Sequence, residues 1–227
     1  MAELITGLEV AAVRANLVRV RAEIAAAAAR GGRAPDTVTI VAATKYVAHD
    51  EMGVLAEAGI TTVGENREQD LRAKVERYGD AFSWEFIGHL QSRKVKAVAP
   101  LVRRIHSASS DSVLSQLERH APDLPHELEV LVEVNVSGEE AKSGLAPADL
   151  DAYLERLRSI ETVRAAGLMT MPPRAETPED SRRWFAALRD LASARNLPEL
   201  SMGTTQDYVV AVEEGATLVR IGTSLFR

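Results

Sequence analysis

Strand-like and helix-like segments alternate along the whole of this chain. Eight short runs rich in Val, Ile, Leu and Thr, each bounded by glycine, proline or polar residues, have the composition of buried strands. The segments between them carry apolar residues at helical spacing. Such alternation implies a parallel sheet with right-handed crossovers. Eight strands in 227 residues predict an α/β fold, a single TIM-like (β/α)8 barrel rather than an open sheet.

The predicted strands cover residues 38–43, 61–63, 83–87, 104–107, 129–136, 163–169, 200–203 and 217–221. An opening helix over residues 8–30 precedes the first strand. Later helices are predicted over residues 50–58, 67–78, 91–98, 112–120, 147–160, 178–196 and 207–214. The pattern contains no linker or short repeat, so we expect residues 1–227 to form one domain.

Composition narrows the chemistry that such a barrel can perform. The net charge is −6 and no basic stripe dominates, which argues against nucleic acid as the main partner. The chain has no cysteine and its histidines lack metal-ligand spacing, so no metal site is expected. No signal peptide is visible, and no apolar stretch of about 18 residues could span a membrane. We therefore expect a cytoplasmic protein without a membrane partner.

A lysine follows the first predicted strand. Residues 38–43 run into Thr44 and Lys45, and in a barrel the carboxyl end of a strand faces the mouth where active sites form. Partial burial there would lower the pKa of a lysine, and an uncharged amine is the nucleophile that forms Schiff bases. The alternative is that Lys45 simply extends into solvent from the end of the strand.

The loops after the seventh and eighth strands suit a phosphate group. They read Ser201-Met202-Gly203-Thr204-Thr205 and Ile221-Gly222-Thr223. Each combines glycine, which permits close backbone approach, with hydroxyls and free N–H groups. Arg220 lies within the apolar last strand and therefore needs a partner. It either pairs with a carboxylate of the barrel or faces a ring nitrogen or an acid group of a ligand.

A Schiff-base lysine opposite a phosphate cradle is suited to pyridoxal 5'-phosphate. Lys45 would bond to the aldehyde, the two terminal loops would hold the phosphate, and Arg220 would face the pyridine nitrogen. A cationic donor at that nitrogen keeps it unprotonated and weakens the cofactor as an electron sink. A phosphate-binding barrel without pyridoxal is another interpretation, but it leaves Lys45 unexplained.

Six motifs, in order along the chain, resemble those of the pyridoxal phosphate homeostasis protein family. They are Ala43-Thr44-Lys45, Gly64-Glu65-Asn66, Phe86-Ile87-Gly88-His89-Leu90-Gln91, Gly167-Leu168-Met169-Thr170-Met171, Ser201-Met202-Gly203 and Val219-Arg220-Ile221-Gly222-Thr223. The resemblance extends from about residue 38 to the C-terminus and therefore covers most of the chain.

The resemblance implies a barrel of the alanine racemase N-terminal domain type that binds pyridoxal 5'-phosphate. It implies Lys45 as the Schiff-base lysine, Arg220 as the contact to the pyridine nitrogen, and Asn66 near the ring. The residues that it implies for the phosphate loops are Ser201, Gly203, Thr205, Gly222 and Thr223. Two positions depart from the usual pattern, because Thr204 replaces a methionine and Arg67 replaces a tyrosine. Neither departure removes an assigned residue.

The resemblance also implies a protein that carries or buffers the cofactor in intracellular vitamin B6 homeostasis, with apo forms of pyridoxal phosphate enzymes as recipients. The alternative is a fold-type III enzyme resembling an amino-acid racemase. Racemisation needs a second acid or base on the opposite face of the cofactor. Alanine racemases take that tyrosine from a partner's C-terminal domain, which this sequence lacks, and neither Tyr46 nor Tyr208 has an evident reason to replace it. We therefore predict a non-catalytic binding protein that is a monomer or a weak dimer.

Overall fold

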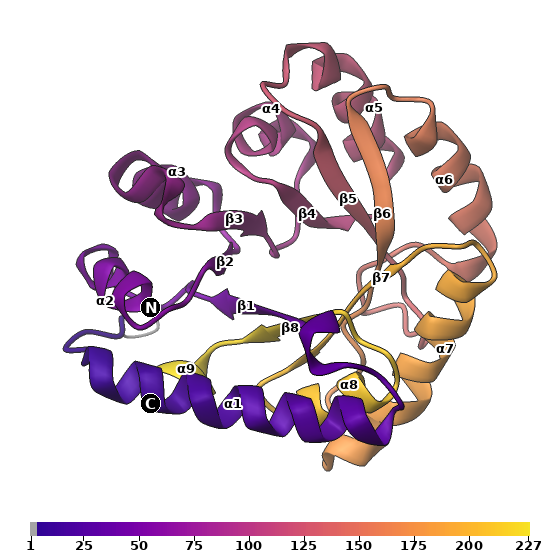
Figure 1. The fold of residues 1–227 in the computed structure, drawn as a ribbon. Coiled ribbons are helices and arrows are strands. Elements are labelled where there is room, and N and C mark those ends of the chain that lie inside the picture. Colours follow the sequence, from indigo (N-terminus) through magenta and orange to yellow (C-terminus); the bar gives the residue numbers. More distant parts are fainter. Residues whose placement is uncertain (1–3) are drawn as a thin grey trace.

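The computed structural model describes residues 4–227, and eight parallel strands within them close into a barrel (Figure 1). The strands are β1 (Thr39–Ala43), β2 (Thr62–Glu65), β3 (Ser83–Phe86), β4 (Arg104–Ala108), β5 (Leu128–Glu133), β6 (Val163–Met169), β7 (Glu199–Thr204) and β8 (Leu218–Ile221). Each strand pairs with the next one in the chain, and β8 returns to pair with β1. The predicted (β/α)8 barrel is confirmed.

Helices surround the barrel on its outside (Figure 1). The α-helices are α1 (Val10–Arg30), α2 (Met52–Glu57), α3 (Glu68–Tyr78), α4 (Val95–Val98), α5 (Asp111–His120), α6 (Leu150–Arg158), α7 (Arg182–Ser193), α8 (Tyr208–Glu213) and α9 (Thr223–Phe226). Short 3-10 helices adjoin several of them, at Pro35–Thr37, His49–Glu51, Gly79–Ala81, Ser92–Lys94, Ala99–Leu101, Ala121–Asp123, Pro147–Asp149 and Pro178–Ser181. The sequence does not predict α9, a single turn that begins immediately after β8.

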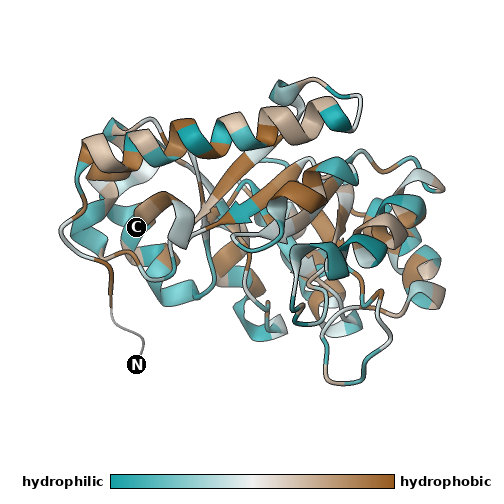
Figure 2. Cartoon of the chain, turned by 90° about the horizontal axis from the view of Figure 1, so that it is seen from below, coloured by the Kyte–Doolittle hydropathy of each residue, from teal (hydrophilic) through white to brown (hydrophobic). Residues whose placement is uncertain are grey.

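The layer between the sheet and the helices is almost entirely apolar. In α1, the side chains of Val13, Leu17, Val20 and Ile24 recur at helical spacing and are buried, as their pattern predicts. This helix packs against α8 and α9, and its polar and apolar residues give the alternating colours along it in Figure 2. It therefore covers the part of the barrel where the last strand meets the first.

The inside of the barrel is only partly apolar. A small hydrophobic cluster there consists of Val41, Leu131, Ala166, Met169 and Leu218. Buried charged side chains come from four strands, and they are Glu85, Arg104, Glu129, Glu133 and Arg220. Charged side chains are rarely buried unless they are paired, so this barrel must satisfy a large set of polar groups internally.

The fifth strand is shorter than the sequence predicts. It ends at Glu133, whereas the alternating pattern continues to Val136. The Asn135 side-chain oxygen accepts a hydrogen bond from the Gly138 N–H at 3.1 Å and another from the Ser137 hydroxyl. Asparagine favours turns by bonding to the backbone a few residues further on, which ends the strand here.

Candidate functional site

A cavity of about 420 Å³ opens at the carboxyl ends of the strands, where the loops following β1, β2, β7 and β8 meet. Its lining residues are Ile5, Ala43, Lys45, Tyr46, Asn66, Ile87, Gly88, Met171, Thr204, Thr205, Gln206, Arg220, Gly222, Thr223 and Phe226. Six of the eight cofactor residues predicted from the sequence are among them. The two others, Ser201 and Gly203, do not line this cavity.

Lys45 lies at the rim of the cavity, two residues after β1 ends. Its side chain is exposed, and Nζ lies over the ring of Tyr46 at 4.9 Å from the ring centroid. The partly buried lysine considered from the sequence is therefore not what the structure shows. The position at the mouth of the barrel does agree with the prediction, because the strand end delivers the side chain there.

A buried ion pair lies directly behind Lys45, on the outer side of the sheet. Lys74 of α3 donates from Nζ to Glu65 Oε1 at 2.6 Å and to the Thr44 carbonyl at 2.8 Å. The Thr44 hydroxyl donates to the same Glu65 oxygen at 2.6 Å. All three side chains are at most 1% exposed. We call this group the Glu65–Lys74 pair, and it ties the end of β1 to the end of β2.

Asn66 reaches the cavity from the residue after Glu65. Its Oδ1 atom is buried and has no hydrogen-bond partner within residues 4–227. Gly88 permits the close contact around it, because a Cβ atom at Gly88 would lie 2.3 Å from the Asn66 carbonyl oxygen. A buried acceptor without a partner is costly, so this amide is available for a polar group of a ligand.

The loop after β7 lies against the beginning of α9. The Thr205 hydroxyl accepts a hydrogen bond from the Gly222 N–H at 3.2 Å, which joins the two predicted phosphate loops. Gly203 has a φ of +87°, and a Cβ atom there would lie 2.5 Å from Cβ of Ala211. Glycine is therefore required for the turn into α8 and for its packing, rather than for contact with the cavity.

Thr204 replaces the methionine that the family pattern leads one to expect, and it has a defined role. Its N–H and hydroxyl both bond to Asp207 Oδ1, at 2.7 and 3.1 Å. Asp207 Oδ2 accepts a further bond from the Ser181 hydroxyl at 2.9 Å. The loop is thus fixed by side-chain hydrogen bonds in place of the packing that a methionine would supply.

Arg220 projects into the barrel interior, and only 5% of it is exposed. It donates from Nη1 to the Ser201 hydroxyl, and from Nη2 to the Thr170 carbonyl at 3.0 Å and the Met171 sulfur at 2.9 Å. Burial lowers the pKa of Arg220 to about 10, so the group is still cationic at neutral pH. Within residues 4–227 it forms no ion pair, which removes the alternative of a salt bridge with a barrel carboxylate.

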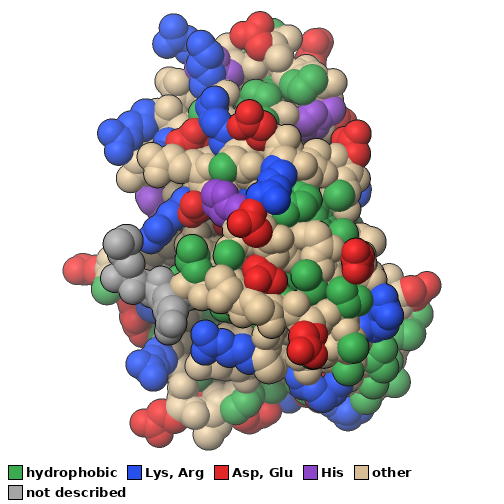
Figure 3. Space-filling model, turned by 90° about the vertical axis from the view of Figure 1, so that its left-hand side faces the viewer, with side chains coloured by type: hydrophobic (Ala, Val, Ile, Leu, Met, Phe, Trp, Pro, Cys, Tyr) green, Lys and Arg blue, Asp and Glu red, His purple; other side chains and the backbone are tan. Residues whose placement is uncertain are grey.

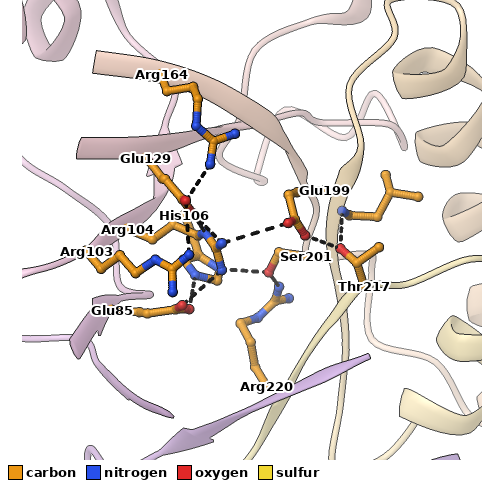
Figure 4. Close-up of polar contacts among 11 residues, drawn as sticks. Glu85, Arg103, Arg104, His106, Glu129, Arg164, Glu199, Ser201, Thr217 and Arg220 are labelled. Carbon is orange, nitrogen blue, oxygen red and sulfur yellow. Dashed lines mark hydrogen bonds and ion pairs between the residues drawn. The ribbon is translucent and has the colours of Figure 1, made fainter. Parts of the chain in front are cut away.

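A chain of polar contacts continues from Arg220 through the barrel (Figure 4). Ser201 Oγ lies 2.8 Å from His106 Nδ1, and His106 Nε2 lies 2.6 Å from Glu85 Oε2. Arg104 then donates to Glu85 at 2.9 Å and to Glu129 at 2.7 Å. Glu129 also pairs with Arg103 and Arg164. We call the chain from Ser201 to Glu129 the interior network.

The sequence interpretation places Ser201 on a phosphate loop, and the structure corrects that position. Ser201 is completely buried beneath Arg220, where its oxygen accepts from the guanidinium. The sequence interpretation also assigns no role to Glu85, Arg104 or His106. The sequence does carry a signal for these residues. Arg104 and His106 occupy alternate positions of one strand, and residues at every second position of a strand face the same side of the sheet. Here that side is the interior of the barrel.

Two further residues of the family-like motifs differ in position. Met171 lines the cavity and contacts Arg220 through its sulfur. His89 is exposed and does not line the cavity. Within residues 4–227 no group of three His, Asp or Glu side chains could hold a metal ion. No helix in the described part of the chain is long and apolar enough to cross a bilayer.

The class of protein follows from comparison with known families. Residues 9–227 match the family model described as alanine racemase, N-terminal domain. The chain is 39% identical to the pyridoxal phosphate homeostasis protein of Aquifex aeolicus, over 93% of this chain and 96% of that protein. It is 37% identical to the protein of the same description from Pseudomonas aeruginosa, with 93% of each chain covered.

Two solved structures share the fold of the whole barrel. A protein from Bifidobacterium adolescentis superposes with a TM-score of 0.86 at 34% identity, covering 99% of this chain and 98% of that one. PipY from Synechococcus elongatus PCC7942, solved with PLP bound, superposes with a TM-score of 0.82 at 29% identity, covering 95% of this chain and all of PipY. The chain therefore belongs to the alanine racemase N-terminal domain family, and the relatives from Aquifex aeolicus and Pseudomonas aeruginosa are described as pyridoxal phosphate homeostasis proteins.

Proposed function

We propose that this protein binds pyridoxal 5'-phosphate in the cavity beside Lys45 and carries or buffers it in intracellular vitamin B6 homeostasis, without catalytic turnover. One observation carries the proposal. Lys45, Arg220 and the two predicted phosphate loops, which are far apart in the sequence, line one cavity of about 420 Å³. The relatives described as pyridoxal phosphate homeostasis proteins, and PipY with PLP bound, support the choice of ligand.

The residues of the cavity fit the chemistry of this cofactor. The cofactor would supply an aldehyde that can condense with a lysine amine with loss of water, and Lys45 is the lysine at the rim. Arg220 would donate to the pyridine nitrogen, and the unpartnered amide oxygen of Asn66 would lie near the ring. The residues that would hold the phosphate are Thr205, Gly222 and Thr223. Ser201 would act indirectly, through its bond to Arg220, and Gly203 would act by allowing the loop to pack against α8.

A carrier role agrees with the polar groups around the cavity. A cationic donor such as Arg220 leaves the pyridine nitrogen unprotonated, which weakens the cofactor as an electron sink. Tyr208 is buried and donates its hydroxyl proton to Glu23, so it is engaged away from the cavity. Tyr46 does line the cavity, and it is the residue on which a racemase-like alternative depends.

The proposal extends to the surroundings in which the protein works. We propose a single barrel domain over residues 1–227 that acts in the cytoplasm as a monomer or weak dimer, with apo pyridoxal phosphate enzymes as recipients. We propose neither a nucleic acid nor a membrane as partner. The absence of a nucleic-acid partner is supported by Figure 3, in which basic and acidic side chains are interspersed on the face of the molecule shown.

The test is covalent labelling of Lys45. We expect the protein incubated with pyridoxal 5'-phosphate to gain a visible absorption band, and borohydride reduction followed by peptide mass mapping to place the adduct on Lys45. The variant Lys45→Ala should lose both signals, whereas the control Lys96→Ala, on the exposed side of α4, should retain them. Folded wild-type protein with an unlabelled Lys45 would overturn the proposal.

A further inference from the structure

With a neutral imidazole at His106, which burial favours, the direction of each hydrogen bond between Arg220 and Glu85 follows from the donors and acceptors present. Arg220 has only donors, so the Ser201 oxygen accepts from it. The hydroxyl of Ser201 then has one proton, and His106 Nδ1 at 2.8 Å is the acceptor. His106 Nε2 therefore carries its own proton and donates it to the Glu85 carboxylate at 2.6 Å. Glu85 is held in turn by Arg104.

This order makes the acceptor capacity of Ser201 depend on His106. The three acceptors that hold Arg220 are the Ser201 hydroxyl, the Thr170 carbonyl and the Met171 sulfur. A carbonyl and a thioether are acceptors under all conditions, but a hydroxyl turns to suit its surroundings. Without an acceptor for its proton, the Ser201 hydroxyl has no fixed orientation toward the guanidinium. Burial also lowers the pKa of His106, which keeps the imidazole neutral and able to accept.

We propose that His106 is a positioning residue for the cofactor site, because it orients the Ser201 hydroxyl and thereby fixes Arg220 toward the cavity. The inference rests on the proposed function in that Arg220 is taken as the contact to the pyridine ring. His106 itself is completely buried and does not line the cavity, so its effect on a ligand must pass through Ser201 and Arg220. Glu85 fixes which imidazole nitrogen carries the proton.

Arg220 also has donors left over for a ligand. Three of its five N–H groups are used by Ser201, Thr170 and Met171. Because the guanidinium lines the cavity, an N–H group that is left over can donate to a ligand that presents an acceptor there. A network that holds the guanidinium still lowers the ordering cost of binding such an acceptor.

Two substitutions at His106 separate positioning from simple packing. In His106→Asn the amide can take the place of Nδ1 and accept from Ser201, whereas in His106→Gln it can take the place of Nε2 and donate to Glu85. We expect His106→Gln to weaken pyridoxal 5'-phosphate binding about tenfold, equivalent to about 1.4 kcal/mol, and to shift the absorption maximum of the bound cofactor. His106→Asn should bind within about threefold of wild type with the wild-type spectrum.

Ser201→Ala provides a smaller change at the next link of the chain. Ser201→Ala should weaken cofactor binding by the same factor as His106→Gln. The double variant Ser201→Ala with His106→Gln should bind no more weakly than either single variant, because both changes break the same link. Additive losses in the double variant, or equal effects of His106→Asn and His106→Gln, would overturn the inference. If a His106 variant does not fold, which circular dichroism without cofactor reveals, Ser201→Ala is compared with wild type alone, and an unchanged affinity would overturn the inference. Wild-type protein that binds no cofactor would instead overturn the proposed function.

Discussion

The barrel buries charge on both sides of its sheet, but the two sides do so differently. On the inside, Glu85, Arg104 and Glu129 form a branched network in which each charged group has at least two polar partners. In the layer between sheet and helices, the Glu65–Lys74 pair bonds to Thr44 and otherwise lies among apolar side chains. The interior network spans several strands and reaches the cavity through the bond between Ser201 and Arg220, whereas the outer pair joins the ends of two strands.

This difference indicates two ways of shaping one site. The interior network fixes the direction of a single side chain, Arg220, through successive hydrogen bonds. The outer pair fixes backbone, because Lys74 bonds to the carbonyl of Thr44, immediately before Lys45, and to Glu65, immediately before Asn66. A branched network should respond to the loss of any member, while an isolated pair should tolerate the loss of both members together.

The largest effect is expected from Arg104→Met. It removes the cation that lies between two buried carboxylates, and the free energy of unfolding should fall by about 4 kcal/mol in urea titrations. The matched control is Arg103→Met, whose side chain is 63% exposed and which should change stability by less than about 0.5 kcal/mol. Similar losses in both variants would contradict the view that the large effect of Arg104 comes from its burial between two carboxylates.

A loss of about 3 kcal/mol is expected for Lys74→Met, because it leaves the Glu65 carboxylate buried without its cation. The double variant Lys74→Met with Glu65→Leu should recover most of that loss, since both charges are then gone. Arg104→Met with Glu85→Leu should recover little, because Glu129 and His106 still lose partners. The comparison between the two regions would fail if the two double variants recovered to the same degree in urea titrations.

The smallest effect is a pH dependence. Burial holds the pKa of His106 below its unfolded value of about 6.5, so below that pH the unfolded chain binds a proton that the folded chain does not. The surrounding charged groups are Glu85, which raises this pKa, and Arg220 and Arg104, which lower it. Stability should therefore fall by about 1.4 kcal/mol per pH unit as the pH decreases from about 6.5.

The measurement is urea unfolding at several pH values between about 7.5 and 5.5. In His106→Asn the slope attributed to this residue should disappear. In His89→Gln, which alters an exposed histidine, the slope should remain. Parallel pH curves for wild type and His106→Asn would show that His106 does not titrate differently in the folded state.

Much of the fold could be predicted from the sequence because strands and helices leave different periodicities. The run ending at Ala43 and the glycines that close several helices indicate the order of elements, and the order indicates the barrel. The ends of elements were less predictable. Asn135 ended β5 early through its own side-chain hydrogen bonds, and no periodicity in the sequence reveals α9.

The candidate site also has a part that could be predicted from the sequence and a part that could not. Residues at strand ends, such as Lys45, Asn66 and Gly222, were predictable because barrels collect strand ends at one mouth. The link between His106 and Ser201 was not, since it joins β4 to β7 and depends on how side chains meet inside the closed barrel. The sequence shows that charged residues face inward, but not which of them bond to one another.

The pairing of β8 with β1 determines when, during synthesis of the chain, the cavity can form. Val41 pairs with Arg220, and Ala42 with Ile221, so the last strand to be synthesised closes against the first. A growing polypeptide therefore has no complete cavity until β8 has emerged from the ribosome. Because a ligand stabilises only the state that binds it, cofactor captured at that moment would hold the newly closed barrel together. Uptake of the proposed cofactor would then report that the barrel has closed.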